Sequence, residues 1–151
     1  MKVVLQRVKS GKVSVRGELV SEIKEGFVLL WGVQKGDTLE DAKILTRKIG
    51  NLRVFADESN KINQSIKDIN GEILLVSQFT LVANILKGNR PSFIDAEDPN
   101  IADKIIKYAV QELSQYSNVK EGIFGENMIV AIENDGPMTI TLECTNGKLI
   151  N

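Results

Sequence analysis

The chain has 151 residues, of which 42% are hydrophobic and 26% charged, and this composition fits one folded domain with a single hydrophobic core. Its 19 basic and 20 acidic side chains give a formal net charge of −1, which excludes a surface that binds nucleic acid through overall positive potential. With no histidine and one cysteine, the sequence also excludes Ser-His-Asp and Cys-His catalysis, Cys/His zinc sites and internal disulfides.

The first third of the chain predicts a sheet. Short apolar stretches separated by glycine or polar residues indicate four strands, over residues 3–8, 13–15, 18–23 and 27–33. The last stretch is apolar on both faces, which is typical of a central strand that is covered on both sides. Such a sheet needs helices to cover it.

Two amphipathic helices are predicted to supply that cover. Thr38 followed by Asp41 forms a capping-box pattern, after which apolar residues recur at three- and four-residue spacing for about four turns. Asp98 and Pro99 are residue types preferred at the N-cap and in the first turn of a second helix, whose apolar face extends to Leu113. We expect both helices to pack broadly on the sheet.

The remaining segments predict one surface excursion and three further strands. Residues 57–70 are polar and end in a turn pair, which indicates an excursion on the surface. Residues 72–81 predict a buried strand whose carboxyl end changes from apolar to polar. Two closing strands, 128–132 and 138–142, are expected on either side of a turn at 133–137.

This order of elements does not alternate regularly between strands and helices. It predicts an α+β domain over residues 1–144, a curved mixed β-sheet or barrel with two main covering helices. A polar C-terminal tail, residues 145–151, is expected to be frayed. Residues 1–7 have no signal-peptide apolar region and no apolar run reaches membrane-spanning length, so we expect a cytoplasmic protein with no membrane partner.

The first candidate site is the run Ser77, Gln78, Phe79 and Thr80 at the end of the buried strand. Hydroxyl groups, an amide and an aromatic ring at such an edge can bind a polar substrate and stack on one of its rings. The alternative is that Phe79 belongs to the core and that the hydroxyl groups only end the strand. Composition alone favours this structural explanation.

A glycine-proline pair and a basic loop are two further candidates. Gly136 allows a backbone or a ligand to approach closely, and the bond before Pro137 can be cis, although a trans hairpin turn is the commoner outcome. Lys87 and Arg90 flank a glycine near Phe93, an arrangement that suits a phosphate. A solvated loop explains the two cations equally well.

Two weaker charge patterns remain. Residues 1–24 carry six cations against two acids, a local excess that forms a modest basic patch if the fold gathers them. Asp95, Glu97 and Asp98 could hold a metal, but helix capping explains them more simply. The sequence therefore predicts no metal and no cofactor.

Four short motifs together carry a family resemblance over nearly the whole chain. They are Gln6-Arg7-Val8, Ser77-Gln78-Phe79-Thr80-Leu81, Lys87-Gly88-Asn89-Arg90-Pro91-Ser92-Phe93 and Asn134-Asp135-Gly136-Pro137-Met138-Thr139. Each is weak alone, but the four in this order and spacing are specific. They resemble the D-aminoacyl-tRNA deacylase family.

The resemblance implies a homodimer with the deacylase fold that hydrolyses the ester between a D-amino acid and the 3′-terminal adenosine of tRNA. In this family the bond between Gly136 and Pro137 would be cis, and each subunit would insert this turn into its partner's active site. An L-side chain would clash with the turn, whereas a D-side chain points outward and glycine has none to reject. The site residues implied are Ser77, Gln78, Phe79 and Thr80 for catalysis, Arg7, Asn134, Gly136, Pro137, Met138 and Thr139 for the chiral filter, and Lys87, Arg90 and Phe93 for tRNA.

Two mechanisms stay open at this point. Thr80 is a candidate nucleophile, but a hydroxyl needs an adjacent base and no neighbour in residues 77–81 is ionisable. The favoured alternative is substrate assistance, in which the 2′-hydroxyl of the terminal adenosine helps to activate water. Backbone N–H groups near Phe79 and Thr80 would then stabilise the oxyanion.

Rival functions come from other classes. One is an RNA- or nucleotide-binding module that catalyses nothing, and another is a small-ester hydrolase centred on Ser77 or Thr80. A third is a relative with relaxed chirality that acts on particular L-residues. Phe79, between Gln78 and Thr80, favours the D-specific enzyme over this relaxed relative.

Overall fold

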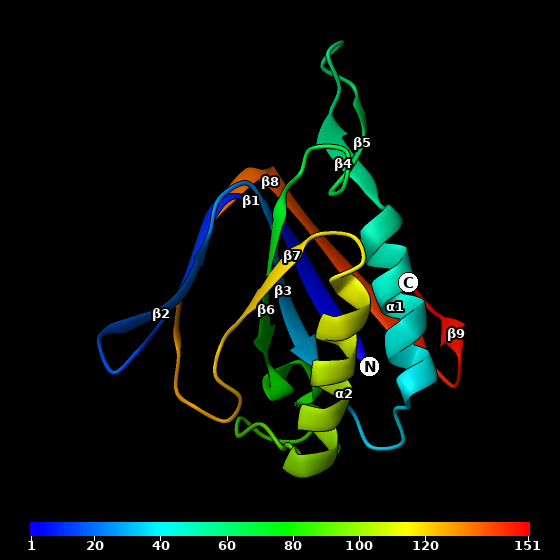
Figure 1. Ribbon diagram of the computed structural model, residues 1–151. Coiled ribbons are helices and arrows are strands. Elements are labelled where there is room, and N and C mark those ends of the chain that lie inside the picture. The colour runs from blue at the N-terminus through cyan, green and yellow to red at the C-terminus, as the bar shows by residue number, and fades with distance from the viewer.

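The computed structural model describes all 151 residues as a curled mixed sheet, a two-stranded hairpin, two α-helices and one short 3-10 helix (Figure 1). No helix has the length and apolar character needed to cross a membrane. The strands are β1 (Lys2–Val15), β2 (Glu18–Ile23), β3 (Gly26–Gly32), β4 (Arg53–Ala56), β5 (Ile62–Ser65), β6 (Glu72–Ser77), β7 (Asn118–Glu121), β8 (Ile129–Thr145) and β9 (Lys148–Leu149). The helices are α1 (Leu39–Asn51), η1 (Phe79–Val82) and α2 (Pro99–Leu113).

The main sheet has the order β7-β6-β3-β1-β8-β9, with β2 paired to β1. The pairs β3–β6 and β6–β7 are parallel and the others antiparallel. Both α-helices lie on one face of this sheet (Figure 1), where Phe27 and Trp31 of β3 join a core of 22 buried residues. On the other face β1 and β8 curl over a second core of six buried residues that includes Val28 and Leu74. The predicted α+β fold, a curved mixed sheet with two covering helices, is confirmed.

The helix termini follow the predicted signals. Thr38 caps α1, since its side chain accepts from the Asp41 N–H while the Asp41 carboxylate accepts from the Thr38 N–H. Asp98 caps α2 by accepting from the Asn100 N–H, and Pro99 occupies the first turn. The capping explanation for Asp98 is therefore confirmed.

The prediction of four N-terminal strands is wrong, because residues 3–8 and 13–15 belong to the single strand β1. This strand pairs with β3 through its first half and with β2 through its second. Gly11 lies where β1 bends over the sheet, and a Cβ atom there would be 2.6 Å from Cγ2 of Val28. The glycine that looked like a break between strands is what allows one strand to curl.

The two predicted closing strands are also one strand, β8, which runs antiparallel to β1 along most of its length. The predicted hairpin turn at 133–137 is therefore wrong. Gln6 pairs with Thr139 and Val8 with Asn134, so four residues of β8 stand opposite the single residue Arg7. Those four residues form a bulge that leaves the strand and returns to it.

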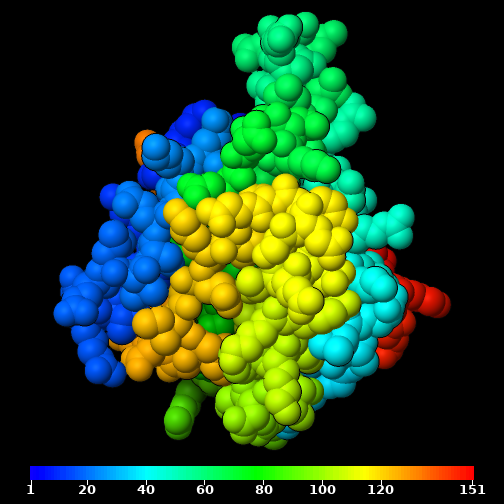
Figure 2. All heavy atoms as spheres, viewed as in Figure 1, coloured from blue at the N-terminus to red at the C-terminus, as the bar shows by residue number.

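The predicted surface excursion is confirmed with an added strand, and two other expectations need correction. The polar excursion contains β5, which pairs with β4 in a hairpin that projects from the molecule (Figures 1 and 2). The strand predicted at 72–81 ends at Ser77, where the chain turns into η1. The C-terminal tail is not frayed, because β9 pairs with β8 and the N–H of Gly147 donates to Asp41 Oδ1 at 2.8 Å.

Candidate active site

The carboxyl end of β6 forms the centre of the candidate site. Ser77 is the last residue of the strand, and the N–H of Gln78 donates to the carbonyl of Trp31 at 2.8 Å. The chain then enters η1 at Phe79. Gly32 permits this turn, because a Cβ atom at Gly32 would lie 2.9 Å from the carbonyl oxygen of Gln78. The predicted motif is thus held directly against the central strand.

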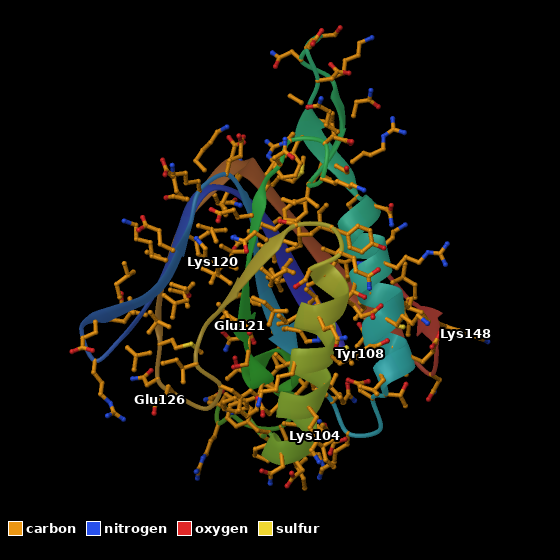
Figure 3. All side chains as sticks on the ribbon, in the orientation of Figure 1. Lys104, Tyr108, Lys120, Glu121, Glu126 and Lys148 are labelled. Atoms are coloured by element: carbon orange, nitrogen blue, oxygen red, sulfur yellow. The ribbon has the colours of Figure 1, made fainter.

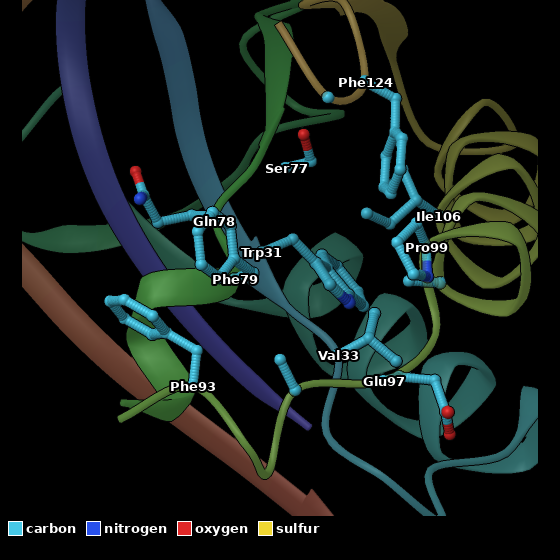
Figure 4. Close-up of a pocket in the computed structure, with 13 residues that line it drawn as sticks. Trp31, Val33, Ser77, Gln78, Phe79, Phe93, Glu97, Pro99, Ile106 and Phe124 are labelled. Carbon is cyan, nitrogen blue, oxygen red and sulfur yellow. The ribbon is translucent and has the colours of Figure 1, made fainter. Parts of the chain in front are cut away.

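Two cavities lie beside this strand end and share Ser77, Gln78 and Phe79 as a common wall. The first has a volume of about 390 Å³, within the range of small-molecule sites, and the second about 290 Å³. The first is lined further by Trp31, Val33, Phe93, Pro99, Ile106 and Phe124 (Figure 4). The second is lined further by Thr80, Glu126, Asn127, Met128 and Val130.

The surface is hollowed between α2 and the segment that follows β7. Figure 2 shows part of β6 at the floor of this hollow. The residues around it include Ser77, Ile106 and Phe124, all of which also line the first cavity. The strand end is therefore reachable from solvent.

Phe79 is not a core residue, since 56% of its surface is exposed. Its ring packs edge-to-face against Phe93, with the ring centroids 4.9 Å apart. Phe93 belongs to the loop that carries the predicted basic residues, so the structure joins two motifs that are separate in sequence. An exposed aromatic pair at the mouth of an apolar cavity offers a stacking surface to a flat ligand.

Thr80 has no base beside it. Its Oγ1 accepts a hydrogen bond from Gln78 Nε2 at 2.5 Å, and Glu126, the one ionisable residue in the lining of the second cavity, pairs with Arg16 at 3.3 Å. The only cysteine, Cys144, is buried on the far side of the core, where desolvation raises the pKa of its thiol to about 11. The protein therefore supplies no activated nucleophile at this site.

The basic loop reaches the site through Phe93 alone. Lys87 and Arg90 are exposed and form no salt bridge. The loop is closed by a pair of backbone hydrogen bonds between Asn84 and Ser92, at 2.8 and 2.9 Å. Two unpaired cations on a closed loop beside an open cavity are free to meet an anionic ligand.

The bond between Gly136 and Pro137 is cis, and the two residues are exposed at the tip of the β8 bulge. Asn134 closes the bulge, since its Nδ2 donates to the carbonyls of Arg7 at 3.1 Å and Met138 at 3.0 Å. Thr139 Oγ1 lies 3.5 Å from Asn134 Oδ1, at the limit of a hydrogen bond. The turn is thus held as a rigid loop on β1.

Arg7 braces the same bulge from below. Its Nη1 donates to the carbonyl of Val54 in β4 at 2.6 Å. Its Nε lies 3.1 Å from Asp135 Oδ2, an ion pair whose geometry leaves Nε without a hydrogen bond. Gly136 has a φ of +117°, and a Cβ atom there would lie 2.8 Å from Arg7 Nη2. The Arg7 guanidinium can therefore lie beneath residue 136 only because that residue is a glycine.

The structure does not bring the turn and the strand-end motif together within one chain. Arg7 pairs with Phe27 at one end of β3, whereas Gln78 bonds to Trp31 four residues further on, about 13 Å along the strand. Three strand spacings also separate β8 from β6. Figure 1 shows β4, which Arg7 touches, at the opposite end of the molecule from the carboxyl end of β6.

The predicted N-terminal basic patch is largely neutralised. Most of its cations pair with acids at 2.8 to 3.3 Å: Lys9 with Glu25, Lys12 with Glu22, Arg16 with Glu126 and Arg7 with Asp135. Figure 3 shows Glu126 and Lys120 on the side of the molecule where β2 lies. Lys120 pairs in turn with Glu72 at 3.0 Å. This face is a network of paired charges and offers little to a phosphate.

Several residues of the site were not predicted. Trp31 comes from β3, Val33 lies just after the end of that strand, Ile106 comes from α2, and Phe124 comes from the segment after β7. Trp31 and Ile106 look like core positions in sequence, because their spacing is that of a buried strand and a buried helix face. Only Phe124 could have been singled out from the sequence, because it is an aromatic residue between two glycines, Gly122 and Gly125.

A comparison with family models matches residues 4–143 to the D-Tyr-tRNA(Tyr) deacylases. A D-aminoacyl-tRNA deacylase of Clostridium novyi (strain NT) is 47% identical over 144 residues, which cover 95% of this chain and 97% of the relative. One of Lactobacillus gasseri is 49% identical over 144 residues, covering 95% and 99%. The chain belongs to the D-aminoacyl-tRNA deacylase family. It is therefore a member of a hydrolase family, as its motifs predict.

Two solved structures share the fold. One, described as a c-Myc DNA unwinding element binding protein, has a TM-score of 0.90 and 42% identity, and the match covers 96% of this chain and 99% of the other. The second, described as a probable eukaryotic D-amino acid tRNA deacylase, has a TM-score of 0.76 at 17% identity, covering 93% and 97%. The second match bears on the fold alone. Together they agree with the fold described above, a curled mixed sheet with two covering helices.

Proposed function

We propose that this protein hydrolyses the ester bond between a D-amino acid, or glycine, and the 3′-terminal adenosine of tRNA. The observation that carries the proposal is the shared wall of Ser77, Gln78 and Phe79 between an aromatic cavity and a more polar one. The ester between an amino acid and adenosine is divided in the same way. The flat adenine base lies on one side of the ester bond, and the polar amino acid lies on the other. Family membership supports the same substrate class.

The adenine ring is assigned to the first cavity and the aminoacyl group to the second. Phe79, Phe93 and Phe124 give the first cavity the flat apolar surfaces on which a base stacks. The second cavity presents the Thr80 hydroxyl and the Asn127 side chain, which suit a polar amino acid backbone. The ester then lies at the strand end between them.

Catalysis in this arrangement depends on position more than on a titrating side chain. The N–H groups of Phe79 and Thr80 open η1, so they have no partner within that helix and can donate to a developing oxyanion. One such donor is worth about 3 to 4 kcal/mol of the barrier. The 2′-hydroxyl of the adenosine and a water molecule supply the attack, since no base lies beside Thr80.

The chiral filter is assigned to the Gly136-Pro137 turn of a second copy, so the active enzyme is a homodimer. The turn is exposed, braced by Arg7 and Asn134, and remote from Phe79 of its own chain. Its carbonyls would receive the substrate ammonium group and leave no room for a side chain in the L configuration. Because the turn only excludes side chains in the L configuration and does not bind the side chain of a D-amino acid, many D-amino acids and glycine fit. Met138 and Thr139 continue the wall beside the turn.

Lys87 and Arg90 are assigned to tRNA phosphates. They lie on the loop that carries Phe93 to the aromatic cavity, so a nucleotide bound there places its backbone near them. This gives the local contact that a protein with a net charge of −1 needs for RNA.

The deciding experiment compares the release of amino acid from matched D-, L- and glycyl-tRNA, and from a D-aminoacyl ester without RNA. The proposal expects D-aminoacyl- and glycyl-tRNA to be hydrolysed and L-aminoacyl-tRNA to be spared. Binding without release would favour a nucleic-acid-binding module, and equal turnover of the RNA-free ester would favour a simple esterase. Release of both enantiomers would contradict the chiral filter.

A further inference from the structure

A third cavity adjoins the chain segment that carries Phe93 to the first cavity. It has a volume of about 280 Å³ and is lined by Lys2, Gln34, Val82, Ala83, Asn84, Ile85, Leu86 and Asp95. Val33 and Ala96 line the first cavity, and their chain neighbours Gln34 and Asp95 line the third. The two cavities therefore lie along the same pair of chain segments, which are joined by the β-bridge between residues 34 and 96.

Asp95 brings a carboxylate without a partner into the third cavity. Its side chain is half-buried and forms no hydrogen bond or salt bridge, and only its backbone is held, by the Lys35 N–H at 2.9 Å. The neighbouring acids have structural roles, since Asp98 caps α2 and Glu97 accepts from the N–H groups of Gly36 and Asp98. A carboxylate that loses part of its water without gaining a donor is unfavourable, so a ligand that brings a donor stabilises it.

Two amide side chains and two aliphatic ones complete the recognition surface of this cavity. Asn84 Oδ1 accepts from the Leu86 N–H at 3.1 Å, which leaves both donors of the Asn84 Nδ2 group free. The Gln34 side chain forms no hydrogen bond, although its backbone N–H donates to Asp37 at 2.7 Å. Ile85 and Leu86 are 71% and 88% exposed and offer an apolar surface. The third cavity thus combines a charged acceptor, free amide donors and aliphatic groups.

This combination is complementary to the edge of cytosine. Cytosine presents an N4 amino group that donates, beside the N3 and O2 atoms that accept, and acidic side chains read the base through its N4 group. The Asp95 carboxylate can accept from N4 while the Asn84 amide donates to N3 or O2. Uracil carries a carbonyl oxygen in place of the amino group, so it would set an acceptor against the carboxylate. The chemistry of the third cavity therefore distinguishes the two pyrimidines.

We infer that the third cavity binds the cytidine that precedes the terminal adenosine of tRNA, with its N4 amino group donating to the Asp95 carboxylate. Every tRNA ends in cytidine-cytidine-adenosine, and this end is single-stranded, the form in which proteins read the edges of RNA bases. With adenine in the first cavity, the preceding nucleotide meets the third along the shared segments. Asp95 is thus a specificity-determining residue for the end of tRNA. The inference rests on the proposed function for the identity of the terminal nucleotide.

Three small ligands test the inference on the unaltered protein. They are AMP and the dinucleotides CpA and UpA, which add cytidine or uridine to the phosphate of the same adenosine. CpA should bind about 10- to 100-fold more tightly than UpA, the range that a hydrogen bond to a charged group gives, and UpA should bind about as weakly as AMP. In a ¹H–¹⁵N spectrum, CpA should shift the amide signals of residues 84–86 and 95, and AMP should leave them in place.

Asp95→Asn provides the matched variant, because it keeps the shape of the side chain and removes its charge. An amide can turn its oxygen to cytosine or its amino group to uracil, so CpA and UpA should bind within about threefold of each other. Glu58→Gln is the control, since Glu58 is an exposed acid without a salt bridge on the β4–β5 hairpin, and it should keep the preference. Equal binding of CpA and UpA to the unaltered protein, no binding of any of the three ligands, or a preference that persists in Asp95→Asn overturns the inference. The ligand series needs no variant, so it remains decisive if Asp95→Asn does not fold.

The outcomes separate this inference from the proposed function. If the protein deacylates D-aminoacyl-tRNA but binds CpA and UpA equally, the cytidine site fails and the activity stands. If CpA is preferred but no D-amino acid is released from tRNA, the cytidine site stands and the activity fails.

Discussion

The side chain of Gln78 donates a hydrogen bond to the hydroxyl of Thr80, which lies two residues further along the chain. The bond occupies an acceptor site on the oxygen that would otherwise be the natural nucleophile of this strand end. Activation would need a neighbour that accepts the Thr80 proton, and the one carboxylate in the same cavity is paired with Arg16. Under the proposed function, Thr80 is therefore expected to position the substrate and not to attack it.

We expect Thr80→Ala to retain activity within about tenfold of the unaltered protein, whereas removing a covalent nucleophile costs on the order of 10⁶-fold in a serine hydrolase. The measurement is the single-turnover release of amino acid from D-aminoacyl-tRNA. A drop to the uncatalysed rate, together with an acyl-enzyme adduct seen by mass spectrometry in the unaltered protein, would overturn this assignment. Ser77→Ala serves as the control for the other hydroxyl of the motif.

A second prediction concerns the clamp on the β8 bulge. Asn134→Asp keeps the shape of the side chain but replaces a donor by a carboxylate that faces the carbonyl oxygens of Arg7 and Met138. The change should lower the free energy of unfolding by about 1 to 3 kcal/mol, since two partly buried acceptors lose their partner. It should also lower chiral selectivity, measured as the ratio of D- to L-aminoacyl-tRNA release.

Asn51→Asp is the matched control for that clamp. Asn51 also donates from Nδ2 to a backbone carbonyl, that of Arg47 at 2.7 Å, but it is exposed at the end of α1. Its replacement should leave selectivity unchanged. Equal selectivity in Asn134→Asp and the unaltered protein would remove the bulge from the chiral filter.

The helices and the central strand could be predicted because their signals are local. Thr38 and Asp41 lie three residues apart and satisfy each other, and the run that contains Phe27 and Trp31 is apolar on both faces wherever it is placed. Glycine was misleading because its meaning depends on residues far away in the sequence. Gly11 looks like a break until Val28 is seen 2.6 Å from where its Cβ would lie.

The candidate site was predicted in its parts and not in its assembly. The strand-end motif and the basic loop were both found, but only the fold shows that Phe79 and Phe93 touch. Trp31 could not be found from the sequence, since a core tryptophan and a cavity tryptophan have the same pattern. What separates them is the cavity beside the ring, and that requires coordinates.

The third prediction concerns the backbone at the tip of the turn. Gly136→Ala adds a methyl group 2.8 Å from Arg7 Nη2 at a φ of +117°, so the guanidinium or the turn must move. We expect a loss of D-aminoacyl-tRNA deacylation of about 100-fold, the cost that a misplacement of about 1 Å can bring to catalysis. Gly17→Ala is the matched control, because Gly17 also has a positive φ, +82°, but has open space around it. If the two variants lose activity equally, backbone strain in general is the cause and the turn has no special role.

The fourth prediction is a pH dependence of stability that comes from Asp41, which has no exposed surface. Burial by itself raises the pKa of this carboxyl group, but hydrogen bonds from the Gly147 N–H and from Thr38 outweigh it and hold the pKa below its ordinary value. A carboxylate whose pKa is lower in the folded state stabilises the fold at neutral pH, and this contribution is lost as the pH falls through the folded pKa. Asp41→Asn should therefore lower the free energy of unfolding by about 1 to 3 kcal/mol at pH 7 and by less at pH 3. Urea titrations at the two pH values measure the difference, and an equal loss at both would contradict it.

The fifth prediction concerns the exposed cations of the basic loop. If Lys87 and Arg90 each meet a phosphate of tRNA, replacing either by serine should reduce the slope of log affinity against log salt concentration by about 0.7 to 0.9. Affinity should fall by a similar factor for every tRNA, because phosphate contacts do not read sequence. Lys61→Ser is the matched control, since Lys61 is an exposed cation without a salt bridge on the β4–β5 hairpin. Binding of uncharged tRNA over a range of potassium chloride concentrations measures the slope. A slope that is unchanged in the loop variants would show that these cations are only solvated, and a change in the hairpin variant of the same size would show that RNA lies across a wider surface.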